Sequence, residues 1–158
     1  MAFKDKANHG KTAIHVAAQA GSLQVLLALI SRGSEVDPLD KDLRTPLSLA
    51  IEKNKYTCVR SLIELGADIE RKDNFGRTPL MFACKLGSKD MVELLLQYKC
   101  DINATNNMKE SCMSFAQKSK NQELIMLLVK QGIPLRPASS SMMRPPSGTR
   151  RPPSGIRK

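Results

Sequence analysis

The sequence predicts an all-α solenoid of helix–turn–helix repeats with β-turn finger loops, followed by an extended C-terminal tail. Two observations predict it: a residue pattern that recurs every 33 residues, and a change of composition after Leu135. The pattern comprises a hydroxyl residue, an alanine and a turn residue, at Thr12, Thr45, Thr78 and Ser111; Ala17, Ala50, Ala83 and Ala116; and Gly33, Gly66, Lys99 and Gly132. A fixed period of this length is typical of stacked structural repeats.

The pattern divides the chain of 158 residues into two parts. We predict one domain over residues 1–135, with four repeats at about 5–37, 38–70, 71–103 and 104–135, and a tail over residues 136–158. This length suits about one domain. No run of apolar residues reaches the roughly 18 that a membrane-spanning helix needs.

The finger loop and first helix of a repeat are clearest in the third copy. Residues 74–76 read as a tight turn, because the glycine at its end accepts a positive φ. Thr78 is placed to cap a helix, and Pro79 suits the first helical position, where its missing N–H costs nothing. Gly87 is expected to end this helix.

The second helix of the third repeat is expected to run from near Ser88 to near Tyr98. It carries one apolar stripe, formed by Met91, Val92, Leu95 and Leu96. Helices this short are marginal alone, so each repeat must be stabilised by packing on its neighbours. We therefore expect one continuous apolar core through the stack.

Three segments resemble the ankyrin-repeat signature: Thr45-Pro46-Leu47-x-x-Ala50, Thr78-Pro79-Leu80-x-x-Ala83, and residues 12–18. The resemblance covers roughly residues 5–135. It implies a β-turn and two antiparallel helices per repeat, stacked into a curved array that binds protein partners.

The chain departs from this signature mainly in its fourth copy. Ser111-Cys112-Met113 replaces Thr-Pro-Leu, and lysines stand at two glycine positions, Lys109 and Lys120. Terminal repeats are expected to be atypical, so we interpret this copy as a C-terminal cap. Leu43 replaces the turn glycine of the second copy, and we expect that finger loop to be less regular.

Partners of this family are usually held by the turn tips and the exposed side of the first helix of each repeat. We call this surface the finger face, and the family resemblance implies that it is concave. Carried over position by position, its candidate binding residues are His9, Lys11, Lys41, Arg44, Lys53, Phe75, Arg77, Lys85, Met108 and Lys118.

Two apolar residues stand out on the finger face, because Phe75 and Met108 occupy equivalent turn tips where no packing role is expected. The candidate basic residues around them outnumber the acidic ones, Asp42, Glu52 and Glu110. An apolar anchor inside a basic rim is a suitable protein-recognition patch, which we centre on Phe75 and Arg77. The alternative is an ordinary solvated surface.

The sequence gives no positive sign of catalysis, a metal or a cofactor, and the chain is predicted not to be an enzyme. No nucleophile–histidine arrangement, glycine-rich phosphate loop or paired metal ligands have recognisable spacing. The family resemblance implies that His15 supports the turn through hydrogen bonds with Thr12. Asn103 looks like the asparagine that asparaginyl hydroxylases modify in ankyrin repeats, although a loop-stabilising role is the alternative.

The tail concentrates positive charge. The chain has a net charge of +10, and residues 136–158 contain no acid. The unit Arg-Pro-Pro-Ser-Gly-x-Arg occurs twice, at 144–150 and 151–157. Such a segment is expected to be extended or disordered alone, with a reach of roughly 70 Å at about 3.1 Å per residue.

The tail is expected to bind a surface of dense negative charge, such as a microtubule, rather than to be a solubilising leftover. The residues proposed for this contact are Arg144, Arg150, Arg151, Arg157 and Lys158. Ser147 and Ser154 each follow an arginine by three residues, as basophilic kinases prefer, and their phosphorylation would weaken such binding. The tail has no aromatic residue to stack on bases, which disfavours nucleic acid.

Together these features predict a non-enzymatic scaffold or adaptor, with a protein on the finger face and the tail docked on an acidic surface. The preferred setting is cytoplasmic, in a microtubule or ciliary assembly, with the nucleus left open. Two alternatives remain: a stoichiometric inhibitor of a soluble protein such as a kinase, and a nucleic-acid-associated regulatory factor. No membrane or small-molecule substrate is predicted.

Overall fold

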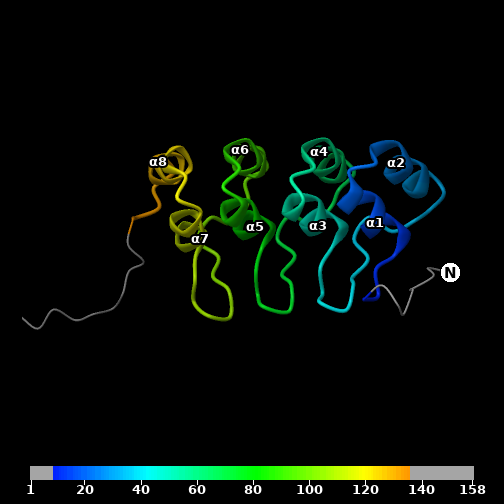
Figure 1. The fold of residues 1–158 in the computed structure, drawn as a ribbon, viewed down its shortest axis with the longest axis horizontal. Coiled ribbons are helices and arrows are strands. Elements are labelled where there is room, and N and C mark those ends of the chain that lie inside the picture. Colours follow the sequence, from blue (N-terminus) through cyan, green and yellow to red (C-terminus); the bar gives the residue numbers. More distant parts are fainter. Residues whose placement is uncertain (1–8, 136–158) are drawn as a thin grey trace, which may run out of the picture.

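The computed structural model describes residues 9–135 and contains eight helices in that range (Figure 1). They form four consecutive antiparallel pairs, one pair within each predicted repeat. The helices are α1 (Ala13–Ala20), α2 (Leu23–Ser31), α3 (Pro46–Glu52), α4 (Tyr56–Glu64), α5 (Pro79–Leu86), α6 (Lys89–Gln97), α7 (Cys112–Ser119) and α8 (Gln122–Lys130).

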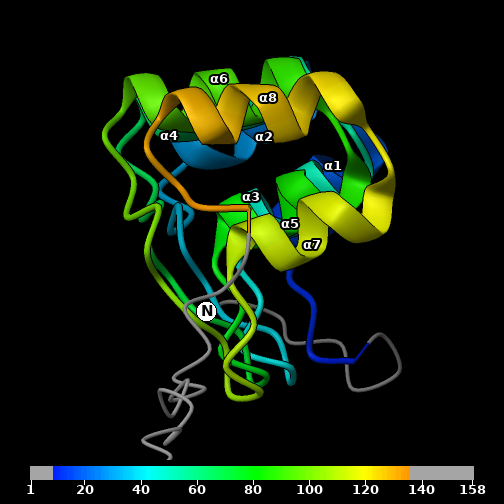
Figure 2. The same cartoon turned by 90° about the vertical axis from the view of Figure 1, so that its left-hand side faces the viewer.

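The helices lie in two layers. Helices α1, α3, α5 and α7 form one layer and α2, α4, α6 and α8 the other, while the finger loops extend away from the first layer (Figures 1 and 2). Neighbouring first helices pack directly on one another along the stack. Between residues 9 and 135 there is no strand, only one isolated bridge between Thr105 and Ser111, so the predicted all-α solenoid is confirmed.

The starts of α3 and α5, the first helices of the two middle repeats, are fixed by local side-chain chemistry, as predicted. The Oγ1 atoms of Thr45 and Thr78 accept hydrogen bonds from the backbone N–H groups of Ser48 (3.2 Å) and Met81 (3.4 Å). Pro46 and Pro79 occupy the first helical positions. Helix α5 ends at Gly87, which has the left-handed φ expected of a C-terminal cap.

A single apolar core runs through the stack between the two layers. One position of the second helices is fully buried in the second, third and fourth repeats, at Cys58, Met91 and Leu124. The alanine positions of the first helices are buried in all four repeats, so neighbouring helices approach closely there. Since each helix is short, this shared core supplies most of the stability of the fold.

The finger loop of the second repeat is regular, so the sequence prediction for Leu43 was wrong. Leu43 has φ 58° and its N–H donates to the Asp40 carbonyl at 3.1 Å. Gly76 makes the equivalent bond in the third repeat at 2.9 Å. The turn therefore holds Leu43 in the left-handed region, where a non-glycine residue costs roughly 1–2 kcal/mol.

His15 has a structural role that links the first two repeats. Its Nδ1 accepts a hydrogen bond from the Thr12 N–H at 3.1 Å, and its Nε2 donates to the Arg44 carbonyl at 3.0 Å. The ring is fully buried, and this burial lowers the pKa of His15. The predicted turn-supporting role is confirmed, and the contact with the second repeat is additional.

The outward side of the first repeat is apolar and exposed. Val16 is 45% exposed and Val25 is 53% exposed. At the same positions in the next repeats, residues such as Phe82 and Met91 are buried against the preceding repeat. No residue between 9 and 135 covers the corresponding side of the first repeat.

The outward side of the last repeat is polar instead. Gln117 is exposed at the position where Ala18, Ile51 and Cys84 are fully buried in the other repeats. Its Nε2 donates to the carbonyl of Leu135, which closes the C-terminal loop over this end. These features fit the predicted C-terminal cap.

Candidate protein-binding surface

Each finger loop is built around one buried polar side chain. Asp40, Asp73 and Asn106 recur at the repeat period, and in each case one side-chain oxygen accepts two backbone N–H bonds, from two and four residues later. The six distances lie between 2.8 and 3.0 Å. These bonds satisfy the backbone of the turn and fix its shape.

The finger tips are joined to one another by backbone hydrogen bonds. The N–H groups of Lys41, Asn74 and Asn107 each donate to a carbonyl of the preceding tip at 3.0 Å, those of His9, Asp42 and Phe75. The tips are therefore ordered as a series before any partner is bound. The close approach excludes a larger residue at Gly76, where an added Cβ would lie 2.4 Å from Asn107 Oδ1.

The predicted binding residues lie along this series of tips and on the first helices. Phe75 is 57% exposed and Met108 is 77% exposed, so both tips present apolar groups to solvent. The remaining candidates divide into two groups: His9, Lys41, Lys53, Lys85 and Lys118 are exposed, whereas Lys11, Arg44 and Arg77 are half-buried.

Arg77 is held by one acid and two aromatic rings. Its Nε and Nη2 atoms contact Asp73 Oδ2 at 2.8 and 2.6 Å. Its guanidinium lies 4.9 Å from the centre of the Phe75 ring and 4.6 Å from that of Phe82. Phe75 therefore does have a packing role, contrary to the sequence prediction, because its ring covers one face of this guanidinium.

The basic rim is less positive than predicted, because several of its cations are paired within the chain. Arg44 contacts Asp40 at 2.9 Å, Asp42 at 3.0 Å and Glu52 at 3.8 Å. Lys118 pairs with Glu110, and this hydrogen bond lowers the pKa of the Glu110 carboxyl. Counting charged residues in the sequence did not reveal these ion pairs, because the partner of each cation depends on side-chain packing in the finger.

Sequence reasoning also missed the residues that build the fingers, Asp40, Asp73 and Asn106. Their signal was present, because they recur at the period of the repeat. The role of Phe82 had no such signal. It shares its repeat position with Leu49, and only the folded geometry places its ring against Arg77.

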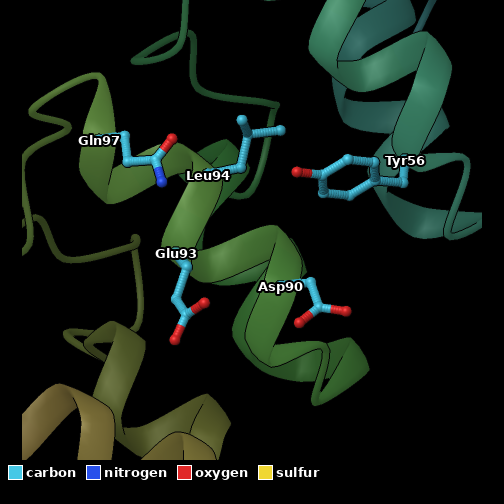
Figure 3. A pocket seen from close by; sticks show the side chains of 5 residues that line it. All are labelled: Tyr56, Asp90, Glu93, Leu94 and Gln97. Carbon is cyan, nitrogen blue, oxygen red and sulfur yellow. The ribbon is translucent and has the colours of Figure 1, made fainter.

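A hollow lies in the layer of second helices, between α4 and α6, and was not predicted. Tyr56 of α4 faces a row of α6 side chains across it (Figure 3). Its volume is about 250 Å³, and the α6 residues that line it are Asp90, Glu93, Leu94 and Gln97. Two carboxylates without a basic lining residue make this hollow acidic.

Asn103 is exposed in the loop after α6. The equivalent residues in the preceding loops, Asp37 and Glu70, accept a backbone N–H from the next loop at 2.8 and 2.6 Å. The donor position that would serve Asn103 is Pro134, which has no N–H. Within residues 9–135 no hydrogen bond holds the Asn103 side chain, so a loop-stabilising role for it has no support here.

The tail residues proposed to bind an acidic surface lie outside the described residues. The same holds for the two candidate phosphorylation sites. These positions are Arg144, Arg150, Arg151, Arg157, Lys158, Ser147 and Ser154.

Within residues 9–135, no group of three or more histidine, cysteine or acidic side chains is arranged to hold a metal ion. The four cysteines, Cys58, Cys84, Cys100 and Cys112, are free and buried, and burial raises the pKa of Cys100 to about 12. None of the helices in the described part is long and apolar enough to cross a membrane.

Comparison with known families gives a match over most of the chain. Residues 2–73 and 69–137 match the family model described as ankyrin repeats (3 copies). A comparison with curated proteins gave no match.

Proposed function

Because the chain belongs to the ankyrin-repeat family, whose repeats generally mediate protein–protein interaction, we propose that it is a non-enzymatic scaffold that holds one protein on its finger face. The family is typically an interaction domain rather than an enzyme. The proposed binding residues are those placed along the tips and first helices, with Phe75 and Arg77 at the centre.

The exposure of Phe75 and Met108 carries this proposal. Two large apolar side chains at successive tips are 57% and 77% exposed, although the backbone beneath them is held by hydrogen bonds. An ordered apolar group with cations beside it suits a buried anchor in a protein interface. Flexible loops would lose more entropy on binding.

We further propose that the tail docks on an acidic surface, with a microtubule or ciliary lattice as the preferred setting and a cytoplasmic location. The support is compositional: a duplicated Arg-Pro-Pro-Ser-Gly unit without acidic residues follows the repeats. Arginines spaced along an extended segment can follow a lattice of carboxylates over a long distance.

Co-sedimentation with polymerised microtubules, with competing RNA at moderate salt, tests the tail. Three proteins are compared: the full chain, a truncation ending at Leu135, and a full-length variant with glutamine at Arg144, Arg150, Arg151, Arg157 and Lys158. The last keeps the length of the tail and removes its charge. The expected result is that only the unmodified full chain pellets and that RNA does not release it.

The other outcomes decide between the alternatives. No pelleting of any of the three proteins would contradict the cytoskeletal setting and favour a soluble target, such as an inhibited kinase. Release by RNA, with an affinity that falls steeply with salt, would favour a nucleic-acid-associated factor.

A further inference from the structure

In three of the four repeats, the residue after the finger turn contacts a residue at the end of the first helix, eight positions later, and the third repeat has Arg77 and Lys85 at these two positions. We call this pair a rung. In the first repeat Lys11 Nζ donates to Gln19 Oε1 at 2.8 Å, and in the fourth Lys118 pairs with Glu110. In the second repeat Arg44 Nη1 lies 3.8 Å from Glu52 Oε2.

The third rung differs, because both of its members are cations, Arg77 and Lys85. Among residues 9–135, no ion pair or hydrogen bond holds the Lys85 side chain, which is exposed. Arg77 is satisfied on two of its nitrogen atoms by Asp73. The Nη1 atom, which in Arg44 faces Glu52, has no acidic partner in this repeat.

We infer that the third rung binds a carboxylate side chain of the protein partner, which takes the place that Glu52 holds in the second repeat. This inference rests on the proposed function and names the chemistry of the partner at that site. Asp73, Arg77 and Lys85 together carry one net positive charge, which a single carboxylate balances. The exposed Phe75 ring beside Arg77 then receives an apolar residue next to the acidic one.

A carboxylate fits the third rung better than a phosphate does. Asp73 already occupies the Nε and Nη2 edge of Arg77, so an incoming acid meets the Nη1 end of the guanidinium. The free N–H groups at that end and the Lys85 ammonium suit the two oxygens of one carboxylate, and the choice against phosphate rests on charge. A doubly charged phosphate would leave one negative charge unbalanced at this site.

The test begins with selection of a random peptide display library on the full-length protein. A selected peptide is then measured by fluorescence anisotropy, together with a copy in which its acid is changed to the amide. Lys85→Glu is the main variant, because it reproduces the Arg44–Glu52 rung and should fold as well as the parent. Lys130→Glu, on α8 in the other helix layer, is the matched control for charge.

We expect the selection to enrich peptides with an acidic residue next to an apolar one. Lys85→Glu should weaken the acidic peptide about tenfold or more and the amide copy about twofold or less, whereas Lys130→Glu should change neither by more than about twofold. Thermal unfolding followed by circular dichroism should show that Lys85→Glu leaves the fold intact.

Three results would overturn the inference, and they differ in what else they overturn. Peptides that bind more weakly to Phe75→Ala but not to Lys85→Glu would support the finger face as the binding site. They would contradict the inference that its third rung binds a carboxylate. A phosphoserine copy that binds about tenfold tighter than the acidic peptide would replace carboxylate by phosphate. If neither substitution weakens the binding of any selected peptide, the proposed function of the finger face is contradicted as well.

Discussion

The outward faces of the first and last repeats differ in the side chains that meet solvent. At the first repeat Val16 and Val25 are exposed, although residues at the same positions are buried in the other three repeats. At the last repeat Gln117 replaces the buried apolar residue of the others. The comparison teaches that the same repeat position does not contribute equally to stability in every repeat. An apolar side chain stabilises the fold only where a neighbouring repeat covers it.

The largest contrast is expected between two truncations at the same repeat position. Leu124→Ala removes a fully buried side chain, so we expect the free energy of unfolding to fall by about 3 kcal/mol. Val25→Ala should cost about 0.5 kcal/mol or less, since that side chain is half exposed. Urea unfolding followed by circular dichroism measures both. Equal losses would show that the first repeat is covered in solution.

The second contrast concerns the link through His15, a position that holds Ser48, Met81 and Ser114 in the other three repeats. His15→Ser removes the bonds to Thr12 and Arg44, and should lower the free energy of unfolding by about 2 kcal/mol near neutral pH. Denaturant unfolding of both proteins, at a series of pH values, measures this difference.

The His15 link should also depend on pH. Burial lowers the pKa of His15 in the folded state, so the unfolded chain, with a pKa of about 6.5, binds the proton more readily. Its stabilising effect is therefore complete above about pH 6.5 and is lost as the pH falls toward the folded pKa. A difference between the parent and His15→Ser that stays constant from neutral to acidic pH would contradict this explanation.

A smaller contrast is expected at the finger turns of the two end repeats. Gly10 has φ 72° and Lys109 has φ 61° at the same repeat position. Gly10→Ala should lower the free energy of unfolding by about 1 kcal/mol, whereas Lys109→Gly should raise it by up to about 1 kcal/mol. Thermal unfolding of the two variants against the parent measures both. Changes of the same sign would show that the turn geometry does not decide their stability.

The smallest effect on stability is expected from Gln117→Ile, which gives the last repeat the residue of the second. The free energy of unfolding should change by about 0.5 kcal/mol or less, because no repeat within residues 9–135 covers this face. The variant should instead associate, since its apolar C-terminal face matches the exposed Val16 and Val25 of another copy. Sedimentation velocity over a range of concentrations detects this. A variant that remains monomeric would show that Gln117 is not what closes this end.

The helices and their ends were predictable from sequence because their signals are local. Thr78, Pro79 and Gly87 each act within about one turn of the helix, and the structure places them at the start and end of α5 as expected. The finger of Leu43 was not predicted correctly. Its shape depends on two contacts that the residue type at position 43 does not indicate. The Asp40 side chain accepts backbone N–H bonds within the finger, and the Lys41 N–H donates to the His9 carbonyl of the neighbouring tip.

The candidate surface was predictable in its position but not in its charge. Phe75 and Met108 lie at exposed tips, as the repeat register indicates. The register does not show which cations are paired, because the Arg44 guanidinium reaches three acids and that of Arg77 reaches one acid and two rings. Those choices depend on side-chain packing between positions that the period alone treats as equivalent.

The hydrogen bonds between successive finger tips have a consequence for binding kinetics. Ordering a free loop costs about 1–2 kcal/mol per residue, and the chain has met this cost for its tips during folding. A partner therefore docks on a preformed surface, with an association rate constant of about 10⁵–10⁷ M⁻¹s⁻¹. A substitution at Phe75 should then act mainly on the lifetime of the complex, through its dissociation rate, whereas Lys85→Glu should also slow association.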